Sequence, residues 1–177
     1  GLKAGVDRAA AMSMLIMPKG TLFICDTFVN AGPTAEQIAR YTVLAAEAIR
    51  HFGIQPRAAL LSHSNFGSSL ASTARKMREA VEMIREMDPD LLVDGEMHAD
   101  AALSEAMREP LIGDGVLKGS ANLLIMPSLD AANISYNMVR MLADGVDVGP
   151  ILLGMDLPCH VLHETINARG IVDMTAL

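Results

Sequence analysis

The stretch AALLSHSNFGSSLASTARKMREAVEMIREM, residues 58–87, holds the unit from which the fold can be predicted. It opens with the apolar run Ala58–Leu61, which follows Pro56 and is typical of a strand buried on both faces of a sheet. A loop rich in Ser and Gly follows over Ser62–Ser69. From about Ser72 to Met87 apolar residues recur at helical spacing, which predicts a helix. A buried strand that leads into a helix is the building element of parallel α/β sheets.

The residues before this unit predict a hairpin and another helix. Two apolar strands flank the Pro-Lys-Gly turn at 18–20, which indicates a hairpin over Met12–Asp26. Thr34 followed three residues later by Gln37 is a capping-box signature. A helix is therefore predicted to begin at Thr34 and to end near Gly53, a typical C-terminal capping residue.

The residues after the unit continue the alternation. Short strands are predicted at Leu91–Val93, Ala121–Met126 and Ile151–Leu153. Helices are predicted at about Ala101–Met107, at Ala131–Leu142 and after Asn167. The helix over Ala131–Leu142 is expected to turn four apolar side chains toward the core, namely Ile134, Met138, Met141 and Leu142.

This alternation predicts a three-layer α/β/α lobe with a mostly parallel sheet and helices on both faces. Ligands of such sheets bind at the carboxyl ends of the strands. The loops after Leu61, Val93, Met126 and Leu153 are therefore the expected positions of a site.

Length and composition exclude several classes of protein. The chain has 177 residues and 18.8 kDa, which suits one domain or one lobe of a larger protein. Hydrophobic residues make up 51%, which excludes disorder, and no apolar run approaches the ~20 residues of a membrane span. A net charge of −7 with 3% aromatic residues argues against a nucleic-acid partner. With no visible signal peptide and with distant Cys25 and Cys159, a cytoplasmic location is expected, although an upstream targeting segment before Gly1 stays open.

The loop Ser62–Ser69 is the leading candidate for ligand binding. It follows a strand and precedes a helix, so its N–H groups and the helix dipole can hold an anion. It lacks the Lys and the spaced glycines of a P-loop. Arg75, Lys76 and Arg78 follow, although cations near a helix N-terminus oppose the dipole. Two interpretations stay open: an anionic ligand nearby, or long side chains that simply reach water.

Other polar clusters have a structural alternative. The segment Asp94–Asp100 holds three carboxylates and a His, which suits a metal site, an acid–base pair or a loop with Asp100 as helix N-cap. Asp130 and Asn133 suit a ligand contact or a helix start. No metal site is predicted, because the spacing matches no metal signature and His160 with His163 lacks a third ligand. Without a GxSxG element, a Ser-His-Asp triad has no support.

Four segments together resemble the phosphate acetyltransferase (phosphotransacetylase) family. They are FGIQPRAALLSHSNFGS at 52–68, DGEM at 94–97, ANLLIMPSLDAANISY at 121–136 and GPILLG at 149–154. The resemblance implies the family's fold, which is similar to that of isocitrate and isopropylmalate dehydrogenases. It also implies a site that binds acetyl-CoA and, in active members, converts acetyl-CoA and phosphate to acetyl phosphate and CoA.

Four residues depart from the active members of that family. After the GPIL-G element these members carry a Lys, a Ser-Arg pair that touches the substrate, and an Asp proposed to deprotonate the CoA thiol. The corresponding positions are Leu157, His163, Glu164 and Gly170. A Glu in place of the Arg would repel an acyl phosphate, so no catalytic residues are predicted. These departures, with PCHVL at 158–162, resemble the C-terminal module of bacterial NADP-dependent malic enzymes.

The resemblance implies that residues 1–177 are the second lobe of a phosphotransacetylase-like module. The first lobe and a malic-enzyme domain, which would hold NADP and a divalent metal, would lie upstream, outside this chain. The module is expected to bind no cofactor, to sense acetyl-CoA, to form at least a homodimer, and to contact neither nucleic acid nor membrane. Active transferase and interaction-only module remain the alternatives. The candidate ligand-binding residues are Ser64, Asn65, Ser68, Ser69, Arg75, Asp130 and Asn133.

Overall fold

The computed structural model describes residues 1–113, 115–162 and 168–175. The described strands are β1 Ala10–Met17, β2 Gly20–Cys25, β3 Arg57–Leu61, β4 Leu92–Met97, β5 Leu123–Ile125 and β6 Val146–Leu153. The described helices are α1 Ala35–His51, α2 Ser72–Met87, α3 Ala99–Leu103, α4 Glu105–Ile112, α5 Leu129–Leu142 and α6 Ala168–Thr175. The predicted alternation of strands and helices is thereby confirmed, as is the helix after Asn167.

The six strands form one sheet in the order β4-β3-β5-β2-β1-β6. The pairs β4–β3, β3–β5 and β5–β2 are parallel, whereas β1 is antiparallel to β2 and to β6. The sheet is therefore mostly parallel, as predicted. The expected hairpin is β1–β2, and its turn is closed by the pair Met17↔Gly20.

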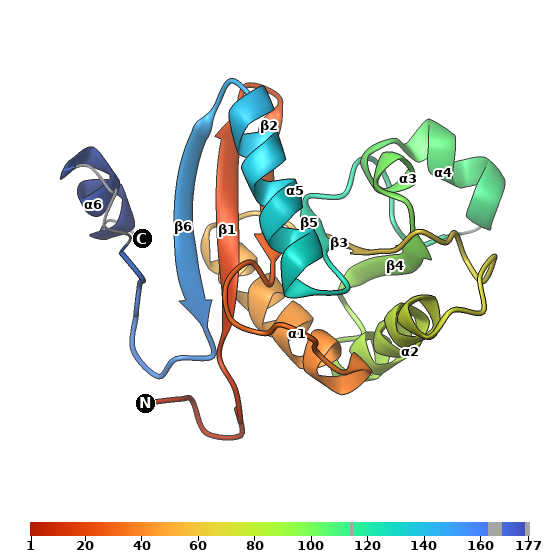
Figure 1. The fold of residues 1–177 in the computed structure, drawn as a ribbon, viewed down its shortest axis with the longest axis horizontal. Coiled ribbons are helices and arrows are strands. Elements are labelled where there is room, and N and C mark those ends of the chain that lie inside the picture. The colour runs from red at the N-terminus through yellow and green to blue at the C-terminus, as the bar shows by residue number, and fades with distance from the viewer. Residues whose placement is uncertain (114, 163–167, 176–177) are drawn as a thin grey trace.

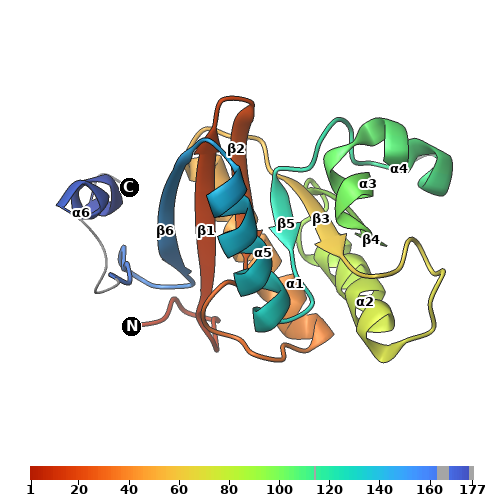
Figure 2. The ribbon, with the colours of Figure 1, turned by 45° about the horizontal axis from the view of Figure 1, so that its top comes forward.

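Helices cover both faces of the sheet, which gives the predicted three layers (Figure 1). On one face α1 and α2 pack against alternate strand residues such as Ala58 and Leu60. The intervening residues Ala59 and Leu61 face α3 and α5 on the other side. Figure 2 shows α6 outside these layers, beyond the edge strand β6. Among the described residues, no helix has the length and hydropathy needed to cross a membrane.

The prediction for the inward face of α5 was wrong. Ala132 and Tyr136 are the buried residues of this helix. The four apolar residues expected to face the core are exposed instead: Ile134 59%, Met138 58%, Met141 81% and Leu142 84%. Helical spacing fixes which residues share a face, but not which face the rest of the chain covers.

The segment after Val93 also differs from the prediction. Asp94, Gly95 and Glu96 lie inside β4 and not in a loop. Asp100 is not an N-cap, because α3 begins after His98. The single helix predicted at 101–107 is two helices, since Ser104 ends α3 and its hydroxyl accepts from the backbone N–H of Met107 at the start of α4.

Candidate functional site at the carboxyl edge of the sheet

Three loops leave the sheet at one edge, because β2, β5 and β3 are parallel neighbours. These loops are residues 26–34, 62–71 and 126–128. Side chains join them. Lys76 Nζ on α2 donates to the carbonyl of Pro127 at 2.7 Å, and Asn133 Nδ2 on α5 donates to the carbonyl of Thr27 at 3.4 Å. The loops therefore form one rim with the starts of α2 and α5, at the edge where α/β proteins bind ligands.

The loop 62–71 is anchored on Glu96, a carboxylate buried in β4. Glu96 Oε1 accepts from Ser64 Oγ at 2.6 Å, from the Gly67 N–H at 3.0 Å and from Arg78 Nη1 at 2.7 Å. The Phe66 N–H donates to the main-chain carbonyl of Glu96 at 2.8 Å. Burial alone would raise the pKa of Glu96, but the bonds from Ser64, Gly67 and Arg78 outweigh it and lower that pKa.

Ser64 differs from the expectation for a ligand contact, because its side chain is fully buried. Besides the bond to Glu96, its Oγ lies 3.0 Å from Ser68 Oγ and accepts from the Ser69 N–H at 3.0 Å. Asn65 is half-buried; its N–H donates to Ser68 Oγ and its Oδ1 accepts from the His98 N–H at 2.8 Å. Ser64 thus holds the loop together and has no free side-chain surface for a ligand.

The backbone of the loop is also largely committed. Its N–H groups donate to other protein atoms at seven residues: Ser62, Ser64, Asn65, Phe66, Gly67, Ser68 and Ser69. The N-terminus of α2 is different, because its N-cap Ala71 provides no side-chain cap and the first turn holds no acidic residue. The positive end of a 16-residue helix is therefore left uncompensated beside the loop. The start of α2 therefore offers more uncommitted N–H groups than the loop Ser62–Ser69 does.

The three cations of α2 have different roles. Arg78 is committed to Glu96 and to the carbonyl of Ser69. Lys76 bridges to the carbonyl of Pro127, and burial lowers the pKa of its amine. Arg75 is exposed, and its guanidinium makes no hydrogen bond or ion pair with any residue that the structure describes. Of the three, Arg75 is the side chain best placed to meet an anionic ligand.

The loop 26–34 is built around a second buried carboxylate that the sequence did not reveal. Asp26 accepts from the N–H groups of Ala11, Phe28, Val29 and Asn30, and from the Asn30 side chain. These bonds turn the chain sharply from β2 toward α1.

Asp130 and Asn133, the candidates on α5, are not its cap. That role belongs to Ser128, whose Oγ accepts from the Ala131 N–H at 3.3 Å. Asp130 is exposed in the first turn, where its charge suits the helix dipole, and Asn133 holds the loop 26–34. No hydrogen bond or ion pair joins either residue to the described atoms of the Ser62–Ser69 loop.

The carboxylates of the segment Asp94–Asp100 have structural partners. Asp94 Oδ2 accepts from the Leu117 N–H at 2.8 Å and Asp94 Oδ1 from Arg85 at 3.1 Å, so Asp94 and Glu96 do not form an acid–base pair. In the described part of the chain no three His, Cys, Asp or Glu side chains form a group that could hold a metal ion. His160 bridges to Ile151 at the edge strand, whereas His163 and Glu164 lie outside the described residues. Gly170 lies in α6.

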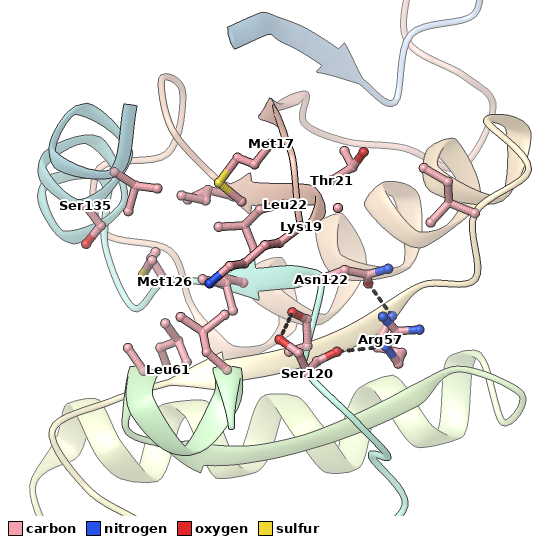
Figure 3. Close-up of a pocket in the computed structure, with 18 of the residues that line it drawn as sticks. Met17, Lys19, Thr21, Leu22, Arg57, Leu61, Ser120, Asn122, Met126 and Ser135 are labelled. Carbon is pink, nitrogen blue, oxygen red and sulfur yellow. Dashed lines mark hydrogen bonds between the residues drawn. The ribbon is translucent and has the colours of Figure 1, made fainter. Parts of the chain in front are cut away.

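A groove lies on the face of the sheet between α5 and α3 (Figure 3). This groove, of about 740 Å³, contains no residue of the Ser62–Ser69 loop. Its apolar lining comes from β2, β3, β5, α3 and α5 and includes Leu22, Leu61, Leu103, Leu124, Met138 and Leu142. Arg57, Ser120 and Asn122 lie together at one end. Sequence reasoning missed the groove because it expected α5 to cover this surface.

Comparison with known proteins gives one family. The phosphate acetyl/butaryl transferase family matches residues 1–177. Among solved structures, the EutD phosphotransacetylase from Staphylococcus aureus superposes with a TM-score of 0.94 at 28% identity. A phosphotransacetylase from Streptococcus pyogenes gives 0.93 at 31% identity. Each match covers 98% of this chain and 54% of the solved one.

The curated relatives fall into two groups. NADP-dependent malic enzymes from Salmonella typhimurium and Escherichia coli are 53% identical over 100% of this chain. The phosphate acetyltransferase from Bacillus subtilis is 31% identical over 99% of it. The chain spans 24% of the length of those two malic enzymes and 54% of the B. subtilis protein.

Proposed function

This chain belongs to the phosphate acetyl/butaryl transferase family, and from that premise we propose that it is a regulatory module of a malic enzyme, which binds acyl-CoA and no longer transfers acetyl groups. One observation carries the proposal: the identity is 53% with malic enzymes but 31% with the B. subtilis phosphate acetyltransferase, over nearly the same residues. In this proposal the malic-enzyme domain, with its NADP and divalent metal, and the first lobe lie outside this chain.

The rim at the carboxyl edge supports the binding half of the proposal. CoA carries several negative phosphate charges, whereas the net charge of this chain is −7, so a CoA site needs local positive charge. The uncapped start of α2, the exposed Arg75 and the neighbouring Lys76 reverse that sign locally. We expect Asn65, Ser68, Ser69 and Arg75 to supply contacts from one side of the rim. Asp130 and Asn133 would act from the α5 side.

The substitutions at His163, Glu164 and Gly170 support the loss of chemistry. By the resemblance given above, these positions correspond to a Ser-Arg pair that touches the substrate and to an Asp proposed as the base in active members of the family. A carboxylate in place of the arginine repels an anionic substrate, and a glycine cannot take a proton. Together the three changes remove both charge stabilisation and base from the transition state.

Titration calorimetry with acetyl-CoA on the complete protein tests the binding. We expect Arg75→Gln to raise the Kd for acetyl-CoA about tenfold, the range of one charge-assisted hydrogen bond. Arg50→Gln is the matched control, since Arg50 lies at the far end of α1 and pairs with Asp88. Equal affinity in the wild type and Arg75→Gln would place the site elsewhere, and absence of binding by the wild type would favour an interaction-only module.

An assay for acetyl phosphate formation from acetyl-CoA and phosphate tests the loss of chemistry. We expect no turnover above background in the complete protein. Turnover of ~1 per second or more, a typical enzyme rate, would identify an active transferase.

The open face of the sheet supports a second proposal, a homodimer through α5 and the groove. Met138, Met141 and Leu142 are exposed next to an apolar hollow, and a contiguous apolar patch of this kind marks an interface. A twofold axis would let α5 of each copy cover the groove of the other. We expect Met141→Lys to give monomers in sedimentation at micromolar concentration. Met87→Lys, at an exposed position on the other face, should leave the dimer intact, and a monomeric wild type would overturn this assignment.

A further inference from the structure

We propose that Glu96 is the positioning residue of the acyl-CoA site: it touches no ligand, but it sets the path of the loop 62–69 and the direction of its hydroxyl hydrogens through Ser64 and Arg78. The inference rests on the proposed binding function and adds to it a residue in β4, on the neighbouring strand. The DGEM segment at 94–97, which contains Glu96, does not by itself indicate that role.

The hydrogen positions follow from the acceptor character of Glu96. An ionised carboxylate can only accept, and Glu96 Oε1 faces the donors of Ser64, Gly67 and Arg78. The single hydroxyl hydrogen of Ser64 is therefore directed at Glu96. Ser64 Oγ can then only accept from Ser68, 3.0 Å away, so the Ser68 hydrogen points to Ser64.

The same chain of bonds reaches the start of the loop and its end. Ser68 Oγ in turn accepts from the Asn65 N–H at 3.0 Å. At the other end, Ser64 Oγ accepts from the Ser69 N–H, and Arg78 donates to the Ser69 carbonyl at 3.2 Å. Ser69 is thus held by both of its main-chain polar groups, two residues before the N-cap of α2. The network therefore connects Glu96 to the residues that directly precede the helix N-terminus.

The unused oxygen of Glu96 makes the carboxylate irreplaceable by its amide. Oε2 is buried and has no hydrogen-bond partner in the described structure. A glutamine with its NH2 at that position would bury donors that meet no acceptor. With the amide reversed, the NH2 would face the donors of Ser64, Gly67 and Arg78. The first orientation keeps a neutral acceptor for these donors but buries an unpaired NH2, and the second removes the acceptor, so both weaken the anchor of the loop.

Asp94 provides a matched control within the same strand. Like Glu96 it is buried in β4 and pairs with an arginine of α2, here Arg85. Its second oxygen accepts from Leu117, far in sequence from the loop 62–69. Asp94→Asn therefore neutralises a second buried carboxylate that pairs with an arginine of α2, at a position with no bond to the loop.

Acetyl-CoA titration of the complete protein compares Glu96→Gln with Asp94→Asn at a temperature where both are folded. We expect Glu96→Gln to raise the Kd about tenfold or more and Asp94→Asn to change it less than about twofold. Ser64→Ala should weaken binding too, and the double variant Ser64→Ala/Glu96→Gln should be no weaker than Glu96→Gln, because both act through one network. An unchanged Kd in Glu96→Gln, or equal losses in Glu96→Gln and Asp94→Asn, would overturn the inference.

Amide hydrogen exchange gives a readout that needs no ligand. In Glu96→Gln the N–H groups of Gly67 and Ser69 should exchange faster, whereas in Asp94→Asn they should keep their wild-type protection. If the wild type fails to bind acetyl-CoA, the proposed function is wrong, and this measurement still decides whether Glu96 positions the loop. Unchanged protection in Glu96→Gln would reject the positioning role whatever the ligand result.

Discussion

The two faces of the sheet are covered to different degrees. On the face of α1 and α2, the apolar stripes of both helices are buried, with Ile38, Ile49, Met77 and Ile84 all fully inaccessible. On the face of α3 and α5, the sheet keeps a groove of about 740 Å³. The apolar stripe of α5 points outward beside it. One face is closed by the helices of this chain, whereas the other keeps an exposed apolar surface.

The contrast teaches that a helical apolar pattern has two possible meanings. It predicts that one face of the helix will be buried, but it does not say whether the same chain or another surface buries it. Comparisons of like residues on the two faces can separate these meanings.

A pair of methionine substitutions gives the largest expected difference. Met77 on α2 is fully buried, whereas Met141 on α5 is 81% exposed. Met77→Ala leaves a cavity and should lower the free energy of unfolding by about 2–5 kcal/mol. Met141→Ala should change it by less than about 0.5 kcal/mol in dilute protein. Urea unfolding at several protein concentrations measures both, and a large, concentration-independent loss in Met141→Ala would show that the chain itself covers α5.

Arg108 tests how the open face is held together. This fully buried guanidinium on α4 donates to four carbonyls, those of Ala101, Ala102, Leu117 and Gly119. Arg108→Ala leaves buried acceptors unpaired and should cost about 2–4 kcal/mol of unfolding free energy. Proteolysis should then cut first in the segment 113–120. Cleavage that begins within α1 or α2 would contradict a local role for Arg108.

Local pattern predicted most of the fold because each unit carried its own signals. The bounds of α2 match the prediction, and the capping box of Thr34 and Gln37 is present with both bonds. The strand β4 continues past Val93, where the predicted strand ends. The prediction missed this continuation because Asp94 and Glu96 are polar, and their partners come from segments that are distant in the sequence. Periodicity over a short window does not contain that information.

The sequence predicted where the candidate site lies, but not which buried side chains hold its loops in place. The Ser62–Ser69 loop was recognisable as polar and as following a strand. Its anchor Glu96 lies 32 residues away from Ser64. From the sequence, the second anchor, Asp26, could be recognised only as the last residue of the predicted hairpin, whereas the structure shows it buried and bonded to the Ala11 N–H. A buried carboxylate with several donors is visible only when the chain is folded.

The two helix caps provide a smaller test of the same comparison. On the closed face, Thr34 caps α1 with a full capping box. On the open face, Ser128 caps α5 through a single 3.3 Å bond. Thr34→Ala should cost about 1 kcal/mol of unfolding free energy, and Ser128→Ala should cost less. Thermal unfolding of the two variants compares them, and a larger cost for Ser128 would mean that α5 is held more firmly than its exposure indicates.

The two tyrosines of the chain give the smallest effect, which is confined to high pH. Tyr41 on α1 belongs to the closed face and Tyr136 on α5 to the open one. Burial, together with the nearby Asp147, raises the pKa of Tyr136 to about 12. Burial raises the pKa of Tyr41 further, aided by Cys25 and Asp26. As pH rises, Tyr136 should therefore ionise first, and Tyr41 should ionise only as the protein unfolds.

The free energy of unfolding should fall with rising pH in the same order, first through the ionisation of Tyr136 and then through that of Tyr41. A tyrosine in the unfolded chain ionises near its ordinary pKa of about 10, so above that pH the unfolded state binds fewer protons than the folded state. The stability that each protonated tyrosine contributes is complete below pH of about 10 and is lost as pH rises through the folded-state value. Tyr136→Phe should remove the loss of stability that Tyr136 causes as the pH rises to about 12. At neutral pH this substitution should change the free energy of unfolding only by the contribution of the weak 3.4 Å hydrogen bond from Tyr136 to Asp147. Tyrosinate absorbance and unfolding curves recorded together test this, and ionisation of Tyr41 before Tyr136 would mean that the face of α1 and α2 is the more open of the two.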